Sequence, residues 1–166
     1  MLAGMSAAQQ PIAAASFADT AGVRVASADE WDPLVARLGG DDVYLRRDYH
    51  VASAHLEPGG ARPVLLHCTG DELGAEVALP LLVRPLPTGT GFDATSAYGY
   101  GGPTSAAPTQ VDVAELGTAL DEWMRANDVV ATFLRFHPLL GNARLAPANA
   151  TTIELGATVA WDVSPG

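Results

Sequence analysis

The sequence contains no lysine, and its nine arginines face nineteen acidic residues, which gives a net charge of −10. Without lysine the chain cannot form a Schiff base with a carbonyl substrate. Arg46 and Arg47 are only a pair, so no basic cluster favours direct nucleic-acid binding by this chain. The absence of lysine beside abundant alanine, glycine and arginine is typical of a GC-rich bacterial coding sequence.

Cysteine is nearly absent as well. The single residue, Cys68, excludes an internal disulfide and leaves the redox compartment open, although a buried thiol with apolar neighbours fits a reducing cytoplasm. No apolar run approaches the ~20 residues that a membrane-spanning helix requires, so we expect no membrane span. The N-terminus lacks both a basic start and a continuous apolar segment, so residues 1–20 are interpreted as a flexible leader and not as a secretory signal.

Several catalytic motifs are also missing. The sequence has no Gly-x-Ser-x-Gly elbow, no His-Glu-x-x-His pair, no Cys-x-x-Cys and no Walker loop. His50 and His55 are five residues apart, a spacing that does not place both on one helix face. We therefore predict no metal site.

What the sequence does contain predicts one α/β (α+β) domain over residues 21–166, because 48% of its residues are hydrophobic and 17% are charged. Alternation or apolar runs predict strands at 23–26, 62–68, 75–86, 92–96, 129–136 and 151–163. Apolar residues at helical spacing predict helices at 31–38, 46–56 and 112–128.

The three predicted helices differ in the sequence signals that indicate their ends and their buried faces. Ser27 and Glu30 form a capping box before the first, and Gly39 and Gly40 follow its end. The second is expected to turn Tyr49, Ala52 and Leu56 inward. The third has the core stripe Val113, Leu116, Leu120, Trp123 and Met124.

Two of the strands carry specific expectations. Residues 129–136 are apolar on both faces, which is typical of a strand buried in the middle of a sheet. Pro80 cannot donate a ladder hydrogen bond, so it is placed at a bulge or on an unpaired side of its strand. Residues 151–163 alternate strictly between apolar and other side chains, which predicts a long strand with one face on a core.

The stretch 98–103, Tyr98-Gly99-Tyr100-Gly101-Gly102-Pro103, joins the strand at 92–96 to the helix at 112–128. Its glycines allow a sharp turn and leave peptide N–H groups accessible, while the tyrosines supply rigid, half-polar walls. Such a junction can hold a carbonyl or phosphate oxygen. The alternative is a tightly packed turn that binds nothing.

Arg135 and His137 follow the strand at 129–136 and are the second group of candidates. Arg135 can clamp a carboxylate or phosphate bidentately, or it can be the structural partner of an acidic residue. His137 has a suitable intrinsic pKa for proton relay, or it can cap the turn before Pro138. His137 and Tyr100 are the catalytic candidates, with Asp93 and Asp162 as further possible bases, while Asn142 is expected to fix its own loop.

The order of elements resembles the acyltransferase fold of the GNAT superfamily, a mixed, mostly antiparallel sheet with flanking helices. Residues 93–103 (DATSAYGYGGP), Trp123 and residues 133–142 (FLRFHPLLGN) resemble the first half of the Fem-like branch. These proteins carry two GNAT-type domains in tandem and include the aminoacyltransferases that build peptidoglycan bridges. The resemblance covers residues 23–163 and implies that this chain is the first half of such a tandem.

The resemblance implies a cytoplasmic N-acyl or aminoacyl transferase in which this chain binds an amine acceptor, a small molecule or a peptide. Tyr98, Gly99, Tyr100, Gly101, Gly102, Arg135 and His137 would form the acceptor site. The donor, acyl-CoA or aminoacyl-tRNA, would be bound by a second GNAT-like domain or a partner chain. Residues 98–111 lack the arginine or glutamine and the glycine spacing that hold pyrophosphate in ordinary GNAT N-acetyltransferases. The alternative is a non-catalytic GNAT-fold binding or dimerisation module that does not bind CoA.

Overall fold

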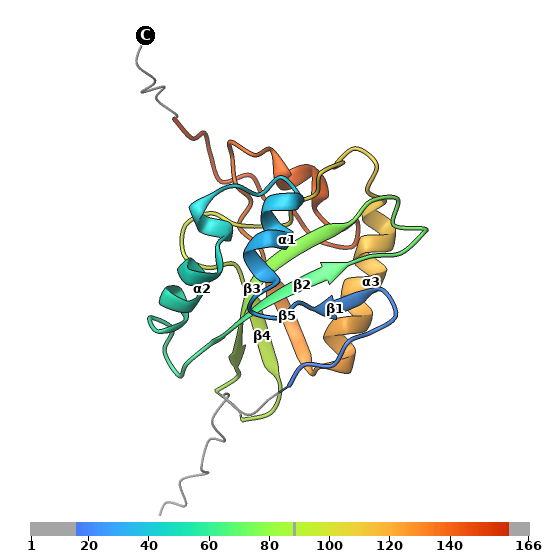
Figure 1. Ribbon diagram of the computed structural model, residues 1–166. Coiled ribbons are helices and arrows are strands. Elements are labelled where there is room, and N and C mark those ends of the chain that lie inside the picture. The colour runs from blue at the N-terminus through green and yellow to red at the C-terminus, as the bar shows by residue number, and fades with distance from the viewer. Residues whose placement is uncertain (1–15, 88, 160–166) are drawn as a thin grey trace, which may run out of the picture.

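The computed structural model describes residues 16–87 and 89–159. Within them a five-stranded sheet has the order β1-β2-β3-β4-β5 and is flanked by three α-helices (Figure 1). The elements are β1 Val23–Val25, α1 Trp31–Arg37, η2 Val43–Leu45, α2 Arg47–Ala54, β2 Arg62–Cys68, β3 Val77–Pro85, β4 Phe92–Thr95, α3 Val113–Ala126, β5 Val129–Phe133 and η3 Asn142–Leu145, where η denotes a 3-10 helix. The expected α+β fold with a mixed, mostly antiparallel sheet is confirmed.

Strands β1 to β4 form an antiparallel meander, and β5 pairs with β4 in parallel after the crossover through α3. Pro80 lies opposite Leu65 in β3, between the bridge of Ala78 to Thr104 and the pairing with β4 that begins at Leu82. Leu65 directs its carbonyl to Ala26 instead of to β3. Pro80 therefore occupies an unpaired side of its strand, as expected, and its missing N–H removes no ladder bond.

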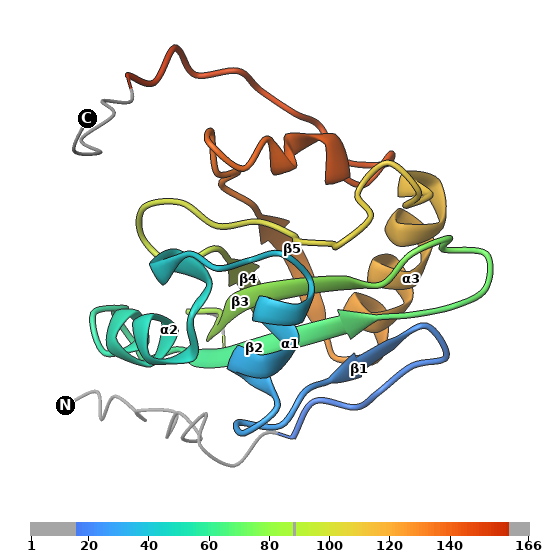
Figure 2. The same cartoon turned by 45° about the horizontal axis from the view of Figure 1, so that its top comes forward.

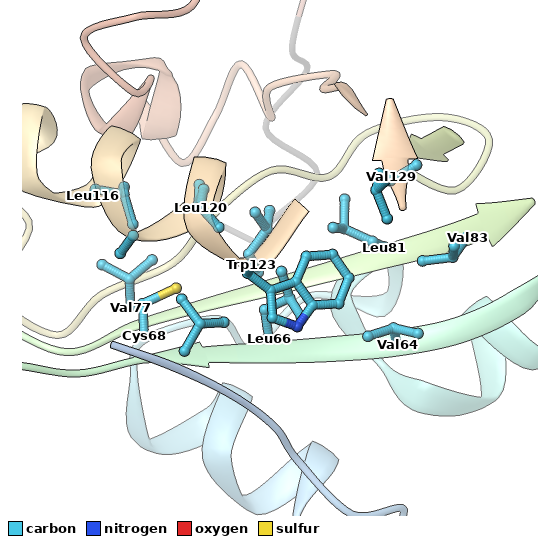
Figure 3. Packing of buried hydrophobic residues seen from close by; sticks show 14 of the residues in the cluster. Val64, Leu66, Cys68, Val77, Leu81, Val83, Leu116, Leu120, Trp123 and Val129 are labelled. Atoms are coloured by element: carbon cyan, nitrogen blue, oxygen red, sulfur yellow. The ribbon is translucent and has the colours of Figure 1, made fainter. Parts of the chain in front are cut away.

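The helices cover opposite faces of the sheet (Figures 1 and 2). On one face α3 packs against alternate residues of β2 and β3, and Trp123 lies among Leu66, Leu81 and their neighbours (Figure 3). On the other face Leu65 and Ala78 pack against α1 through Trp31 and Leu34. The period-two alternation of β2 and β3 thus divides the core into two layers.

Helices α1 and α3 follow the sequence pattern closely. Glu30 accepts hydrogen bonds from the N–H and the hydroxyl of Ser27, at 2.9 and 2.8 Å, which is one half of the expected capping box. The N-cap of α1 is Glu30 and not Ser27, and its side chain caps none of the helix N–H groups. The core stripe of α3 is buried at Leu116, Leu120 and Trp123. None of the helices in the described part of the chain has the length and apolarity to traverse a bilayer.

The prediction for the inward face of α2 is correct at Tyr49, which packs against the cluster of Ala54 and its neighbours, and wrong at the other two positions. Its buried residues are His50, Ser53 and Ala54, whereas Ala52 and Leu56 are exposed. The helix ends at Ala54, so Leu56 lies beyond it, 80% exposed. A buried histidine hydrogen-bonded to the helix backbone, with Nδ1 3.0 Å from the carbonyl of Arg46, replaces the apolar stripe that the sequence suggested.

The prediction of a central, doubly buried strand at 129–136 is also wrong. β5 ends at Phe133 and is the edge strand of the sheet, with only Val129 buried. Helix α3 covers its start, and Val130 and Phe133 are 65% and 55% exposed. An apolar run on both faces identified a strand here but could not identify its place in the sheet.

The two ends of the described chain also differ from expectation. Residues 151–159 form no strand within the described structure and are exposed, and residues 160–163 of the predicted strand lie outside the described residues. At the other end, Phe17 packs edge-on against Phe92 with ring centroids 5.5 Å apart, and Ala18 donates its N–H to Asn127 Oδ1 at 2.7 Å. The fold therefore reaches back into the segment predicted to be a flexible leader, of which residues 1–15 lie outside the described residues.

Candidate functional site

A cavity of about 960 Å³ lies beyond the carboxyl ends of β4 and β5. Tyr100 follows β4, and Arg135 and Phe136 follow β5, and all three line it. Leu120 and Met124 of α3, sheet residues such as Leu81, and the extended residues 151–156 also line it, and its acidic lining residues are Asp121 and Glu154. In sheets with parallel strands, ligands bind in the crevice outside the carboxyl ends of those strands. β4 and β5 are the parallel pair of this sheet, so the cavity occupies the expected position for a ligand site.

Backbone and side-chain hydrogen bonds hold the two strand ends together. The N–H of Ser96 donates to the carbonyl of Phe133 at 3.0 Å, and the N–H of Arg135 donates to Ser96 Oγ at 3.0 Å. Gly101 forms an isolated parallel bridge with Phe136. The glycine-rich turn and the segment around Arg135 are thus neighbours, although 30 or more residues separate them in sequence.

The glycines of the turn are required mainly by close contacts within the protein. Gly99 has φ +90°, and a Cβ there would lie 2.5 Å from the ring of Tyr44. Gly101 and Gly102 are buried, and a Cβ on Gly102 would lie 3.0 Å from Asn142 Nδ2 and 3.1 Å from Phe136. Gly99 lines the cavity, but Gly101 and Gly102 are not among its lining residues. Much of the turn therefore fits the alternative of a tightly packed segment.

The two tyrosines of the turn have different environments. Tyr98 is 78% exposed and does not line the cavity, and its carbonyl accepts a hydrogen bond from the hydroxyl of Tyr49 at 2.6 Å. Tyr100 is half-buried, with ring centroids 5.6 Å from Tyr44 and 5.2 Å from His137. Burial raises the pKa of Tyr49, and the nearby Tyr44 raises it further, so its hydroxyl stays protonated as a donor. Of the tyrosines at 98 and 100, only Tyr100 can touch a ligand in the cavity.

Arg135 is exposed and lies at the cavity wall. Its guanidinium stacks over the ring of Phe133, with Cζ 5.0 Å from the centroid, and Nη1 lies 3.5 Å from the carbonyl of Ser96. Among the described residues it forms no ion pair with an acidic side chain, so the alternative of a structural pair is not supported there. Apart from the Nη1 group directed to Ser96, its donors are free to bind a carboxylate or phosphate.

His137 is buried, with both ring nitrogens engaged. Nδ1 accepts the N–H of Leu139 at 3.2 Å, and Nε2 lies 3.3 Å from Asp42 Oδ2. Because Nδ1 accepts, the proton of the neutral ring is on Nε2, the nitrogen that lies near Asp42. His137 thus caps the turn after Pro138, as the second interpretation of this residue proposed, and it does not line the cavity.

Asn142 connects this turn to the glycine-rich one. Its Oδ1 accepts the N–H of His137 at 2.7 Å, and its Nδ2 donates to the carbonyls of Gly101 and Pro103 at 2.7 and 3.0 Å. The sequence predicted a loop-fixing role for Asn142 but not the link to the glycine-rich turn. Asp42, which completes the network, was missed, because nothing in its spacing connects it to His137, 95 positions later.

The remaining acidic candidates do not reach the cavity. Asp93 forms two parallel hydrogen bonds with Arg84, from Nε at 2.9 Å and Nη2 at 2.7 Å, and Glu57 accepts from Nη1 at 2.9 Å. These carboxylates raise the pKa of Arg84, led by the hydrogen bonds to Asp93. Asp93 is therefore a structural partner, and Asp162 lies outside the described residues.

The start of α3 is poorly suited to hold a pyrophosphate. Oδ1 of Asp112 accepts the N–H groups of Ala114 and Glu115 at 2.9 and 3.1 Å, so the first turn already has an anionic cap. A pyrophosphate bound there would compete with the Asp112 side chain for these two N–H groups. The carboxylates of Asp112 and Glu115 would also repel it. In the part of the chain that the structure describes, no group of three His, Cys, Asp or Glu residues can hold a metal ion.

No family model, curated protein or solved structure matches this chain. The feature of this chain that indicates a function is the cavity, above all the guanidinium of Arg135 beside the aromatic residues Phe133, Tyr100 and Phe136.

Proposed function

We propose that this chain is the acceptor-binding half of an acyltransferase of the GNAT, Fem-like type. The acceptor is an amine that also carries a carboxylate, such as an amino acid or peptide, and it binds in the cavity at the carboxyl ends of β4 and β5. Arg135 holds the carboxylate, and the apolar wall around Phe136 and Leu120 holds the side chain. The observation that carries this proposal is an exposed, unpaired guanidinium at the wall of a ligand-sized apolar cavity.

The arrangement of the sheet is compatible with this proposal. An antiparallel meander followed by a helical crossover to a parallel strand is the order on which the resemblance to the acyltransferase fold was based. Acyl transfer to an amine depends mainly on positioning and on stabilisation of the developing oxyanion. Tyr100, which lines the cavity, can donate its hydroxyl in that role.

The donor is bound elsewhere in this proposal. The anionic cap of Asp112 disfavours CoA pyrophosphate at α3, and a net charge of −10 disfavours tRNA on this chain. A second GNAT-like domain or a partner chain would supply the donor site. A cytoplasmic location belongs to the same proposal, because Cys68 is a free, fully buried thiol that needs no oxidising compartment.

A second candidate is a non-catalytic binding module with the same fold. The engagement of both nitrogens of His137 favours it, because this removes the strongest candidate for a base. The two candidates share the cavity and Arg135 but differ in catalysis. Transfer of an acyl group to a cavity-bound amine, once the donor-binding domain or partner is present, supports the enzyme and excludes the module.

Calorimetry with two matched probes tests the binding site. Alanyl-phenylalanine carries the amine, the apolar side chain and the carboxylate, whereas its C-terminal amide lacks only the carboxylate. We expect Arg135→Ala to weaken binding of the acid at least about tenfold and to leave the amide unaffected, because a hydrogen-bonded ion pair contributes roughly 1.5–3 kcal/mol. Arg47→Ala, which removes an exposed arginine on α2, is the charge-matched control.

A parallel titration with acetyl-CoA tests whether the acyl donor binds outside this chain. We expect no saturable binding at micromolar concentration, because the start of α3 is already capped. Micromolar binding of acetyl-CoA would place the donor site on this chain and contradict the proposal. Equal effects of Arg135→Ala on the acid and the amide would contradict the role of the guanidinium.

A further inference from the structure

The outer edge of β5 is a strand edge with exposed apolar side chains. Among the described residues no strand pairs with that side. The carbonyl of Phe133 accepts from Ser96 of the β4 side, so the backbone groups of the alternate residues Thr132 and Leu134 point outward. Soluble proteins usually protect such edges with lysine, proline or inward-facing charge, but β5 reads VVATF and has none of these. The edge is therefore a template for another strand.

Residues 151–159 have the complementary property. Ile153, Leu155 and Val159 alternate with polar residues and glycine as in a half-buried strand, yet they are exposed, Leu155 by 91%. Figures 1 and 2 show this segment running away from the sheet. In the described residues, the segment 151–159 thus has the pattern of a strand but pairs with no sheet, and the outer edge of β5 has no neighbouring strand.

We propose that residues 151–159 of one copy pair antiparallel with the β5 edge of a second copy, and that the exchange is reciprocal. Charge fixes the register, because Arg135 is the single charged residue of 129–136 and Glu154 the single charged residue of 151–159. The guanidinium has donors on two edges, so it can contact Glu154 of the second copy with one edge and keep the other for the acceptor carboxylate of the proposed function. Placing these two charged residues opposite each other brings Leu155 beside Leu134, which already packs on the core under α3. A shift of one residue would bury Glu154 and expose Leu155.

The same register satisfies the other positions of the pairing. Ile153 falls opposite Phe136, and Val159 falls opposite the exposed Val130, so the apolar side of the segment extends the α3 face of the sheet. Gly156 falls opposite Phe133, whose ring can cover the missing side chain. No apolar residue of the segment is then directed to solvent on the opposite face.

The segment 151–159 that pairs with the β5 edge comes from a second copy and not from the same chain. Residues just before it are held on α3, where the N–H of Ala148 donates to the carbonyl of Val113 at 2.9 Å and Asn149 Nδ2 donates to that of Gly117 at 3.4 Å. The segment lines the same cavity as the end of β5, yet it leaves the edge of its own β5 unpaired. A reciprocal exchange closes both edges with twofold symmetry.

The oligomeric state tests this proposal. In light scattering coupled to gel filtration we expect the wild-type chain to elute as a dimer at about 100 µM, since paired strands with an apolar face form specific dimers. Leu155→Lys should give a monomer, because a lysine in the new core weakens association by at least about a hundredfold. Leu56→Lys replaces an exposed leucine far from both segments and should remain dimeric. A wild-type monomer, or a dimeric Leu155→Lys, would overturn the proposal.

A cross-link distinguishes exchange between copies from pairing within one chain. The double variant Arg135→Cys and Glu154→Cys places two thiols opposite each other, and the native Cys68 does not compete because it is fully buried. Oxidation of the double variant, with no ligand added, should give a disulfide-linked dimer. Each single variant should stay largely monomeric on a non-reducing gel. A cross-link within one chain, no cross-link, or equal dimerisation of a single variant would contradict the exchange.

Discussion

The imidazole of His137 lies 3.3 Å from the carboxylate of Asp42, with Nε2 facing Oδ2. On the other side of the ring, Nδ1 accepts the N–H of Leu139. A catalytic base needs a free nitrogen aimed at the substrate, and this ring has neither a free nitrogen nor a place at the cavity wall. The contact between His137 and Asp42 therefore links the loop before η2 to the turn after β5. It stabilises the loops around the cavity and does not contact a ligand.

Replacing His137 with alanine should destabilise the fold by about 2 to 3 kcal/mol, because it leaves buried polar groups unpaired and opens a cavity. The affinity for alanyl-phenylalanine, measured on the folded variant, should change little. Urea unfolding and calorimetry give the two quantities. A variant of unchanged stability but lost binding would return His137 to the binding site.

Arg135→Ala should have the opposite profile. The guanidinium is exposed and contacts mainly the ring of Phe133, so its removal should cost at most about 1 kcal/mol of unfolding free energy. Thermal and urea unfolding measure this cost. A loss of several kcal/mol would mean that Arg135 has a structural partner and would remove the main argument for a ligand.

Gly99→Ala and Gly59→Ala separate backbone strain from close contact. Both glycines have positive φ, +90° and +83°, so each substitution should cost about 1 kcal/mol in conformational energy. A Cβ at position 99 would also collide with Tyr44, whereas position 59 has nothing within 4 Å. We expect Gly99→Ala to cost about 2 kcal/mol more than Gly59→Ala in urea unfolding. Equal costs would indicate that Tyr44 moves aside freely.

His50 should make stability depend on pH above the range of the carboxylates. Burial lowers its pKa from 6.5 to about 4, although its hydrogen bond to the carbonyl of Arg46 opposes the shift. The unfolded chain therefore takes up this proton first as the pH falls, and the associated stability is lost between pH 6.5 and 4. The expected loss between pH 7 and 4.5 is about 2 kcal/mol.

Asparagine at position 50 checks this assignment, because it can keep the hydrogen bond to the carbonyl but does not titrate. The His50→Asn variant should lose the dependence between pH 6.5 and 4.5, whereas His55→Asn, which changes an exposed residue, should keep it. Glu30 and Glu76, whose pKa values are lowered to about 2 chiefly by hydrogen bonds, affect stability below pH 4.5. An unchanged slope in His50→Asn would contradict the assignment.

Local patterns predicted the elements of this fold well. The stripe through Leu116, Leu120 and Trp123 determined α3, and the alternation of Val77 and Leu79 determined which face of β3 it covers. These signals are short-range, because they depend on the period of one element against one layer. Each of these signals can therefore be recognised in a single sequence.

Apart from the inward face of α2 and the strand predicted at 151–163, the misses concern relationships between distant segments. The run at 129–136 is apolar on both sides, but only the strand order shows that β5 is an edge. Arg135 and Tyr100 were paired correctly as neighbours, whereas the contacts that remove Gly101, Gly102 and His137 from the cavity are made by Asn142 and Asp42. No local spacing encodes such contacts, which arise from the arrangement of loops around the sheet.

In the proposed function, the cavity beside Arg135 binds an amine acceptor through its carboxylate. Amide chemical-shift changes in a ¹⁵N-labelled chain titrated with alanyl-phenylalanine test this binding directly. We expect saturable shifts concentrated at Tyr100, Arg135 and Phe136 and at Leu120 of α3, which disappear in Arg135→Ala. Shifts at other surfaces only, or shifts that persist in that variant, would contradict it.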